Sequence, residues 1–185
     1  MTRVFQATKQ KVHNRGVPPD SFLDELIDWG LSAPDSVFAR NDTFDIYSSV
    51  VSDLGPWTSL PQRKAALLEV LRVLAGFESS WKWDAGVDTT NPTSNTPCTE
   101  EAGAFQCSGN SMGLSPELKQ LLLDSTGSST CETFIAHTKS DHRFAIDYCA
   151  RLLRLTTKHH GPVKHRDINP WLRRNAAAEF MRFLA

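Results

Sequence analysis

One acidic residue, Glu78, follows directly on a run of apolar residues that has the spacing of a helix. The run is AALLEVLRVLAGF, and Phe77 and Trp81 lie close to the carboxyl group in the sequence. Helix C-termini carry partial negative charge, and apolar neighbours exclude water, so both effects favour the protonated form of a carboxyl group. A protonated carboxyl group can cleave a glycosidic bond by protonating the leaving oxygen. Glu78 is therefore predicted to be a general acid.

The loop after Glu78 holds the candidates for a second catalytic group. Residues 81–101 are rich in Thr, Asn, Pro and Ser and show no regular pattern, as is typical of a functional loop. Glu101 or Asp88 is the predicted helper, either as a base that activates water or as a nucleophile. With neither in place, Glu78 would act alone, as acid and then as base.

The predicted substrate-binding residues surround the same loop. An apolar element that ends in an amide, Gly103-Ala104-Phe105-Gln106, follows it. An amide can hydrogen-bond to sugar hydroxyls, and an indole ring can stack on a pyranose face. The predicted set is Gln106, Trp81, Phe105 and Ser80.

The four cysteines, an even number, are expected to form two disulfides. We predict the pairs Cys98–Cys107 and Cys131–Cys149, the first closing a small loop at the cleft. None of the cysteines forms a CxxC motif or has histidine at zinc-finger spacing, so no structural metal site and no cofactor is expected. Four independent buried thiols are the alternative.

The elements that must position these groups are mainly helices. Residues 1–19 are predicted to be a poorly ordered lead-in and residues 20–185 a single compact domain with long cleft loops. Gly30 is the predicted stop of the first helix, and residues 43–54 form a helix or, over 48–51, a strand. The expected helices cover residues 20–30, 34–40, 43–54, 60–79, 115–123, 131–137, 141–157 and 169 onward.

Charge and hydropathy exclude two classes of partner. The net charge is −1, with 20 basic and 21 acidic residues, so no global field favours nucleic acid. No run of apolar residues is long enough to span a membrane. The N-terminal residues have no apolar core of the kind that a Sec signal peptide has.

Four segments, in order, resemble the soluble lytic transglycosylase and goose-type lysozyme families. They are Glu78-Ser79-Ser80-Trp81, Gly103-Ala104-Phe105-Gln106, AIDYCARLL from residue 145, and HGPVK from residue 160. The resemblance covers about residues 65–167 and implies a lysozyme-like α+β fold with Glu78 as the catalytic glutamate. It departs at Phe105, where the families usually have methionine, and at His159-His160, where they have Tyr-Asn. We expect these two histidines only to cap the preceding helix.

The cysteines and the long insertion before Gly103 make the chain similar to lysozyme-like effectors that bacteria deliver through the type VI secretion system. That resemblance implies peptidoglycan glycan strands as substrate, secretion without a Sec signal, action in the periplasm of a recipient bacterium, and a periplasmic immunity protein that covers the cleft.

Three alternatives remain open. They are a housekeeping lytic transglycosylase, a non-catalytic glycan-binding or inhibitor module, and a peptidoglycan amidase or peptidase in which Cys107 pairs with His137, His142 or His160.

Overall fold

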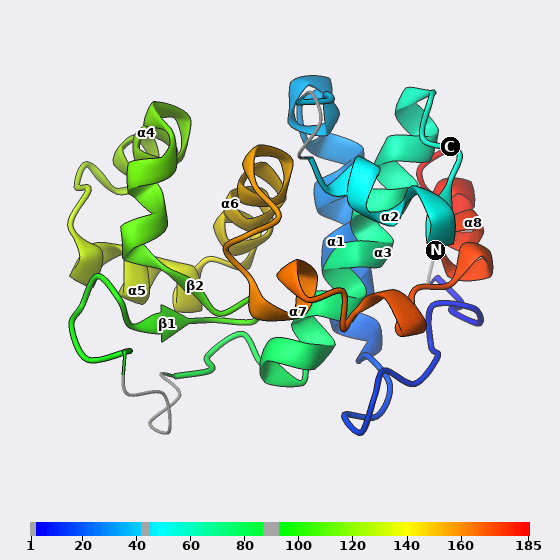
Figure 1. The fold of residues 1–185 in the computed structure, drawn as a ribbon, viewed down its shortest axis with the longest axis horizontal. Coiled ribbons are helices and arrows are strands. Elements are labelled where there is room, and N and C mark those ends of the chain that lie inside the picture. The colour runs from blue at the N-terminus through cyan, green and yellow to red at the C-terminus, as the bar shows by residue number, and fades with distance from the viewer. Residues whose placement is uncertain (1–2, 42–44, 87–92) are drawn as a thin grey trace.

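The structure is a computed structural model, described here over residues 3–41, 45–86 and 93–185, and it is mainly helical. In Figure 1, α6 lies between a group formed by α1, α2, α3 and α8 and a second group formed by α4, α5 and a short hairpin. The elements are α1 (Asp20–Ser32), α2 (Ile46–Leu54), α3 (Leu60–Ser79), β1 (Glu101–Ala102), β2 (Cys107–Ser108), α4 (Pro116–Thr126), α5 (Cys131–Ser140), α6 (His142–Leu155), α7 (Gly161–Lys164) and α8 (Arg174–Phe183), with 3-10 helices at Asp35–Phe38, Gly109–Leu114 and Asn169–Trp171.

Helix α3 is the centre of the first group of helices. It begins with a capping box, in which Ser59 and Gln62 bond reciprocally, and Pro61 occupies its first turn. Every residue from Ala65 to Gly76 is buried. Because the whole circumference is covered by α1, α2, α8 and neighbouring segments, the helix is a rigid support for the residues at its end (Figure 1).

A fully buried ion pair lies on this helix. Arg72 donates two hydrogen bonds of 2.7 Å to the carboxylate of Glu69, and neither side chain is exposed. Both side chains also form hydrogen bonds with the backbone. The Arg173 amide donates to the Glu69 carboxylate, and the Arg72 guanidinium donates to the Gln10 carbonyl. Two charges buried together in this way are tolerated only while both stay paired.

Residues 3–19 are packed against the body of the protein, so the prediction of a poorly ordered lead-in was wrong. Val12 and Thr8 are completely buried. The Thr8 amide and hydroxyl both donate to the carboxylate of Glu179 on α8, each at 2.7 Å, and the Gln6 amide donates to it as well. Sequence patterns missed this segment because its order comes from tertiary contacts without regular secondary structure.

The helix predictions were largely confirmed, with two corrections. Residues 46–54 form helix α2, as predicted, so the alternative of a strand over 48–51 is excluded. The last α-helix begins at Arg174 after a separate 3-10 turn at 169–171. Helix α1 continues through Gly30 to Ser32 and ends where Ala33 adopts an extended conformation before Pro34. Gly30 instead lets the Leu184 side chain pack closely against α1, since a Cβ at position 30 would lie 3.0 Å from that side chain.

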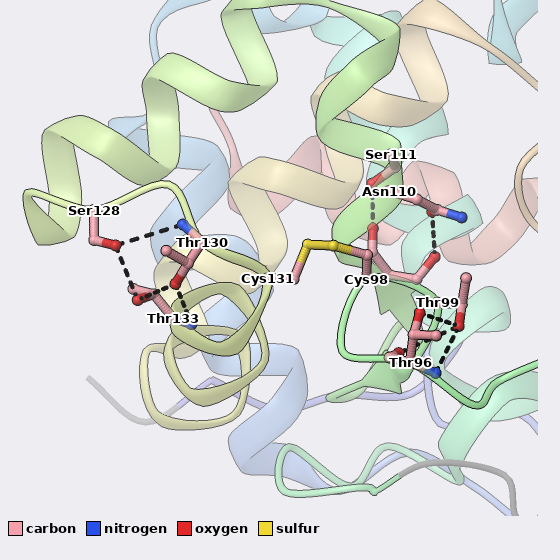
Figure 2. Close-up of a disulfide and its surroundings, with 10 residues drawn as sticks. Thr96, Cys98, Thr99, Asn110, Ser111, Ser128, Thr130, Cys131 and Thr133 are labelled. Carbon is pink, nitrogen blue, oxygen red and sulfur yellow. Dashed lines mark hydrogen bonds between the residues drawn. A yellow bond between two sulfur atoms is a disulfide. The ribbon is translucent and has the colours of Figure 1, made fainter.

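The disulfide pairing differs from the predicted pairs. Cys98 is bonded to Cys131, the first residue of α5, while Cys107 and Cys149 are buried thiols. Figure 2 shows the disulfide beside Asn110 and Ser111 of the 3-10 helix after β2. The backbone amide of Asn110 donates a hydrogen bond to the Cys98 carbonyl. Gly109 makes room for the bridge, because a Cβ there would lie 2.9 Å from the Cys131 sulfur. The hairpin places Cys107 away from Cys98, although they are close in sequence.

Within the described residues, no helix is both long and apolar enough to cross a membrane.

The buried ion pair gives a first prediction. Arg72→Met should lower the free energy of unfolding by about 3–5 kcal/mol, because Glu69 is left charged and unpaired in the core. The double variant Glu69→Leu/Arg72→Met should recover most of this loss, apart from about 1 kcal/mol for the orphaned Arg173 amide. Urea denaturation measures both, and a single variant as stable as the parent chain would contradict the pairing.

Candidate functional site

A polar cleft of about 490 Å³ lies where the end of α3, the hairpin and the segment entering α7 meet. Figure 1 shows these three parts of the chain together along one side of the molecule. The lining residues are Glu78, Thr93, Thr99, Glu101, Gln106, Ser108, Asn110, His159, His160, Gly161 and Pro162. Two carboxylic acids, two amides and several hydroxyl groups therefore converge on one open space.

Glu78 occupies the last turn of α3, and its side chain is 19 % exposed. The chain turns sharply after it, since Ser80 and Trp81 both have left-handed backbones, with φ of 57° and 61°. Such conformations cost about 1–3 kcal/mol each for residues with a Cβ and persist only where the surroundings enforce them. Here the buried Trp81 indole donates a 2.8 Å hydrogen bond to the Arg72 carbonyl. The indole also packs where a Cβ on Gly76 would stand, 2.7 Å away.

Ser79 joins the end of α3 to the turn of the hairpin, a role that the sequence did not indicate. Its hydroxyl donates to the Ala104 carbonyl at 2.8 Å and accepts a bond from the Lys82 amide. Glu78 and the hairpin are thereby held in a fixed relation across the cleft. The predicted substrate contact is at the next serine, Ser80, and no structural role was predicted for Ser79.

The hairpin presents Glu101 and Gln106 to the same cleft. Its two strands pair antiparallel, with Glu101 opposite Ser108, around the turn at 103–106. Gly103 has φ of 73° and sits against α5, where a Cβ would lie 2.9 Å from the Thr138 side chain. Gln106 is also left-handed, and its side-chain amide donates to the Gly103 carbonyl at 2.9 Å. This bond orients the amide and leaves its oxygen free to accept a bond from a substrate.

Several predicted contacts lie elsewhere. Phe105 is completely buried, and Trp81 is 5 % exposed, so both are core residues and neither lines the cleft. Ser80 serves as the left-handed cap of α3 and is not among the lining residues. Asp88 lies outside the described residues. The structure thus brings together Glu78, Glu101 and Gln106, and the aromatic platform predicted from the sequence is absent from the described part of the cleft.

His160 is the second residue whose place in the site the sequence did not predict. It does not cap the preceding helix, which ends at Leu155, but stands at the start of α7 with 3 % of its surface exposed. Its Nδ1 lies 3.5 Å from Glu78 Oε1, so the imidazole forms the buried wall behind the candidate acid. Its neighbour His159 lines the cleft, and burial together with the charge on His160 lowers the pKa of His159 to about 3.

Two thiols lie on the far side of the His160 ring. The sulfur atoms of Cys107 and Cys149 are each 3.8 Å from Nε2. A hydrogen bond from Cys149 and the positive charge of His160 lower the pKa of Cys107 to about 6, although burial opposes this. Burial alone would lower the pKa of His160, but the Cys107 thiolate and Glu78 raise it to about 10. Among the described residues, these three side chains form the group of ligand atoms close enough to share one metal ion.

Comparisons with protein-family models, with curated protein sequences and with solved structures found no match to this chain. Function is therefore inferred from the cleft itself.

The bridging hydroxyl of Ser79 gives a second prediction. Ser79→Ala should lower the free energy of unfolding by about 1 kcal/mol, because the Lys82 amide and the Ala104 carbonyl lose a partner. Ser125→Ala is the matched control, since that hydroxyl bonds only to the Leu121 carbonyl of its own helix. Equal stability of the two variants in urea would contradict a bridge between α3 and the hairpin.

Proposed function

We propose that this protein is a glycoside hydrolase that cleaves the β-1,4-linked glycan backbone of bacterial peptidoglycan, on a lysozyme-like scaffold. The observation that carries the proposal is the convergence of Glu78, Glu101 and Gln106 on one open, polar cleft. These residues come from the helix end and the hairpin whose sequences resemble the lytic transglycosylase and goose-type lysozyme families. Most glycoside hydrolases use a pair of carboxylic acids as catalytic groups. Amides beside them can form hydrogen bonds with the sugar.

The composition of the cleft suits a sugar chain. Hydroxyl and amide groups also line the cleft, from Thr93, Thr99, Ser108 and Asn110. Such groups both donate and accept hydrogen bonds, as the hydroxyl and acetamido groups of a glycan require. The large, mainly polar opening also favours an extended polymer over a compact apolar ligand, which would need an enclosed apolar pocket.

In the proposed mechanism, Glu78 donates its proton to the glycosidic oxygen as the C–O bond breaks, and positive charge develops on the sugar ring. The Glu101 carboxylate then removes a proton from the water molecule that attacks the anomeric carbon. Gln106, fixed by its bond to Gly103, accepts a hydrogen bond from the substrate and holds it against Glu78. His160 does not touch the substrate in this scheme. It positions the Glu78 carboxyl group from behind.

The disulfide and the resemblance both support a biological setting for the proposed enzyme. A disulfide such as Cys98–Cys131 persists in an oxidising compartment, and the bacterial periplasm is both oxidising and the site of peptidoglycan. We place the enzyme there as an antibacterial effector delivered by type VI secretion. A cognate immunity protein in the periplasm would bind over the cleft, because covering Glu78 and Gln106 blocks the glycan directly.

A peptidoglycan amidase is the second candidate, favoured by one observation. Cys107, His160 and Glu78 follow one another at distances of 3.8 and 3.5 Å, in the order of a nucleophile, a base and an orienting carboxylate. However, Cys107 is 1 % exposed and does not line the cleft. A peptide carbonyl cannot reach its sulfur from the cleft, so the geometry favours Glu78 as the reacting group.

The role of Glu78 gives the third prediction. Glu78→Gln should lower the rate of glycan cleavage by about 10²–10⁴-fold while the fold is kept, because an amide of the same shape cannot donate the proton. Clearing of a purified cell-wall suspension measures the rate, and circular dichroism controls for folding. Cys107→Ser is the matched test of the amidase candidate. Loss of activity in the serine variant, with Glu78→Gln still active, would reverse the assignment.

The role of Glu101 gives the fourth prediction. Glu101→Gln should lower the hydrolytic rate by a similar factor, because the attacking water loses its base. Mass spectrometry of the released muropeptides should show hydrolysed, reducing sugar ends in the parent enzyme. Anhydro-sugar ends together with full activity of Glu101→Gln would instead identify a lytic transglycosylase, in which Glu78 acts alone.

The effector assignment gives the fifth prediction. Directed to the periplasm of a test bacterium by an artificial signal peptide, the parent chain should lyse the cells, and Glu78→Gln should not. Co-expression of the immunity protein, sought in the open reading frame beside the gene, should restore growth. If a folded enzyme that is active in vitro leaves the cells unharmed without that neighbour, the effector assignment is overturned.

A further inference from the structure

Three buried ligand atoms meet behind the cleft, contributed by parts of the chain that are far apart in sequence. They are the sulfur of Cys107 on β2, the sulfur of Cys149 on α6 and the Nε2 atom of His160 before α7. Both sulfur-to-nitrogen distances are 3.8 Å, and all three atoms lie within 4.8 Å of one another. No side chain in the group is more than 3 % exposed.

The two sulfur-to-nitrogen distances are close to an edge of a zinc coordination tetrahedron. Zinc binds thiolate sulfur at about 2.3 Å and imidazole nitrogen at about 2.0 Å, which places sulfur and nitrogen roughly 3.6 Å apart. The same geometry places two sulfur atoms roughly 3.8 Å apart, and the two sulfur atoms here lie within 4.8 Å of each other. The two sulfur-to-nitrogen distances of 3.8 Å therefore need to shrink by only a few tenths of an ångström, and the sulfur-to-sulfur distance by at most about 1 Å, to accept the ion.

The Nδ1 atom of His160 also has the kind of partner that zinc-binding histidines have. A histidine that ligates zinc usually donates its second N–H to a carboxylate, which fixes the tautomer and the direction of the ring. His160 Nδ1 faces Glu78 Oε1 at 3.5 Å, so the structure supplies such a carboxylate.

The electrostatic balance also favours a divalent ion. Two thiolates and a neutral imidazole carry a charge of −2, which one divalent cation cancels, and a neutral centre is far less costly to bury than an isolated charge. Coordination also accounts for two adjacent thiols in a chain that carries a disulfide elsewhere, since a metal-bound sulfur is withheld from thiol–disulfide exchange.

We propose that Cys107, Cys149 and His160 bind one zinc ion, with Glu78 as the carboxylate that orients the histidine. Two soft thiolates and an imidazole select zinc over magnesium or calcium, which prefer oxygen ligands. No fourth Cys, His, Asp or Glu of the described residues joins the cluster, so a water molecule completes the tetrahedron. The site lies behind the cleft, and its three zinc ligands take no part in the proposed glycosidase reaction. Glu78 serves both proposals, since Oε1 faces His160 while the other carboxyl oxygen can carry the proton.

The test uses the complete chain, incubated with Zn²⁺ under nitrogen without a reducing agent, so that Cys98–Cys131 stays closed. One zinc per chain should remain bound after gel filtration, as measured by elemental analysis. Co²⁺ used in place of zinc should give the sulfur-to-cobalt charge-transfer absorption that only thiolate ligation produces. The Cys98–Cys131 pair is an internal control, because disulfide sulfur does not contribute to that absorption.

Variants distinguish this site from adventitious binding. Cys149→Ser and His160→Gln should each abolish stoichiometric zinc binding, whereas His165→Ala, at an exposed histidine on the next turn, should bind as the parent chain does. Glu78→Gln should keep one zinc per chain but weaken its affinity by about 10–100-fold, as loss of an orienting carboxylate does.

Three results would overturn the proposal. One is a protein whose Cys107 and Cys149 thiols are intact and which takes up no zinc. Another is a disulfide between these two cysteines in the isolated protein, found by peptide mapping. The third is equal zinc binding by Cys149→Ser and His165→Ala. Each of these readouts is independent of cell-wall cleavage. A failure of the zinc proposal can therefore be distinguished from a failure of the glycosidase assignment.

Discussion

The structure depends on one constraint, the complete burial of helix α3 from Ala65 to Gly76. A helix whose central turns are covered on every side can neither shift nor rotate without opening the core, so the residue at its end has a fixed position. The Glu69–Arg72 pair strengthens this constraint, because it must stay closed for its charges to remain buried. Its backbone partners, at Gln10 and Arg173, also tie both ends of the chain to the centre of α3. Glu78 therefore reaches the cleft on a helix that the core holds in place.

The opposite wall of the cleft is held by different means. The hairpin at 101–108 is too short to be stable by itself, and it is fixed by contacts around it. Ser79 bonds to its turn, Gly103 packs against α5, and the Cys98–Cys131 disulfide joins the preceding loop to α5. Glu78 on a rigid helix on one side and a strand pair fixed by its surroundings on the other make a preorganised cleft, which is what the proposed cleavage of a glycosidic bond would require.

His160 connects the cleft to the interior. One ring nitrogen faces Glu78 and the other faces two buried sulfur atoms, so the imidazole belongs to both environments. Any change in the state of the thiols therefore changes the hydrogen bonding and charge directly behind Glu78. In the proposed mechanism, this coupling gives His160 an influence on Glu78 although the imidazole takes no part in the reaction itself.

The sequence by itself determined most of the helices and the position of Glu78 at the end of one of them. The apolar run that ends at Glu78 has a local pattern, and a local pattern can be read without knowing the fold. Caps such as Ser59 with Gln62, and Ser115 before Pro116, are likewise local and mark where helices begin. The order of residues also indicated that Gln106, and either Glu101 or Asp88, would accompany Glu78.

Only the tertiary structure decided which distant residues meet. Neither the Cys98–Cys131 bond nor the meeting of Cys107, Cys149 and His160 has a spacing signature, because each joins segments through the packing of β2, α5 and α6. The same holds for the aromatic residues, since Trp81 and Phe105 look alike in sequence whether they face sugar or core. Burial and long-range pairing depend on how whole elements pack, and that packing is a property of the complete chain that no local segment encodes.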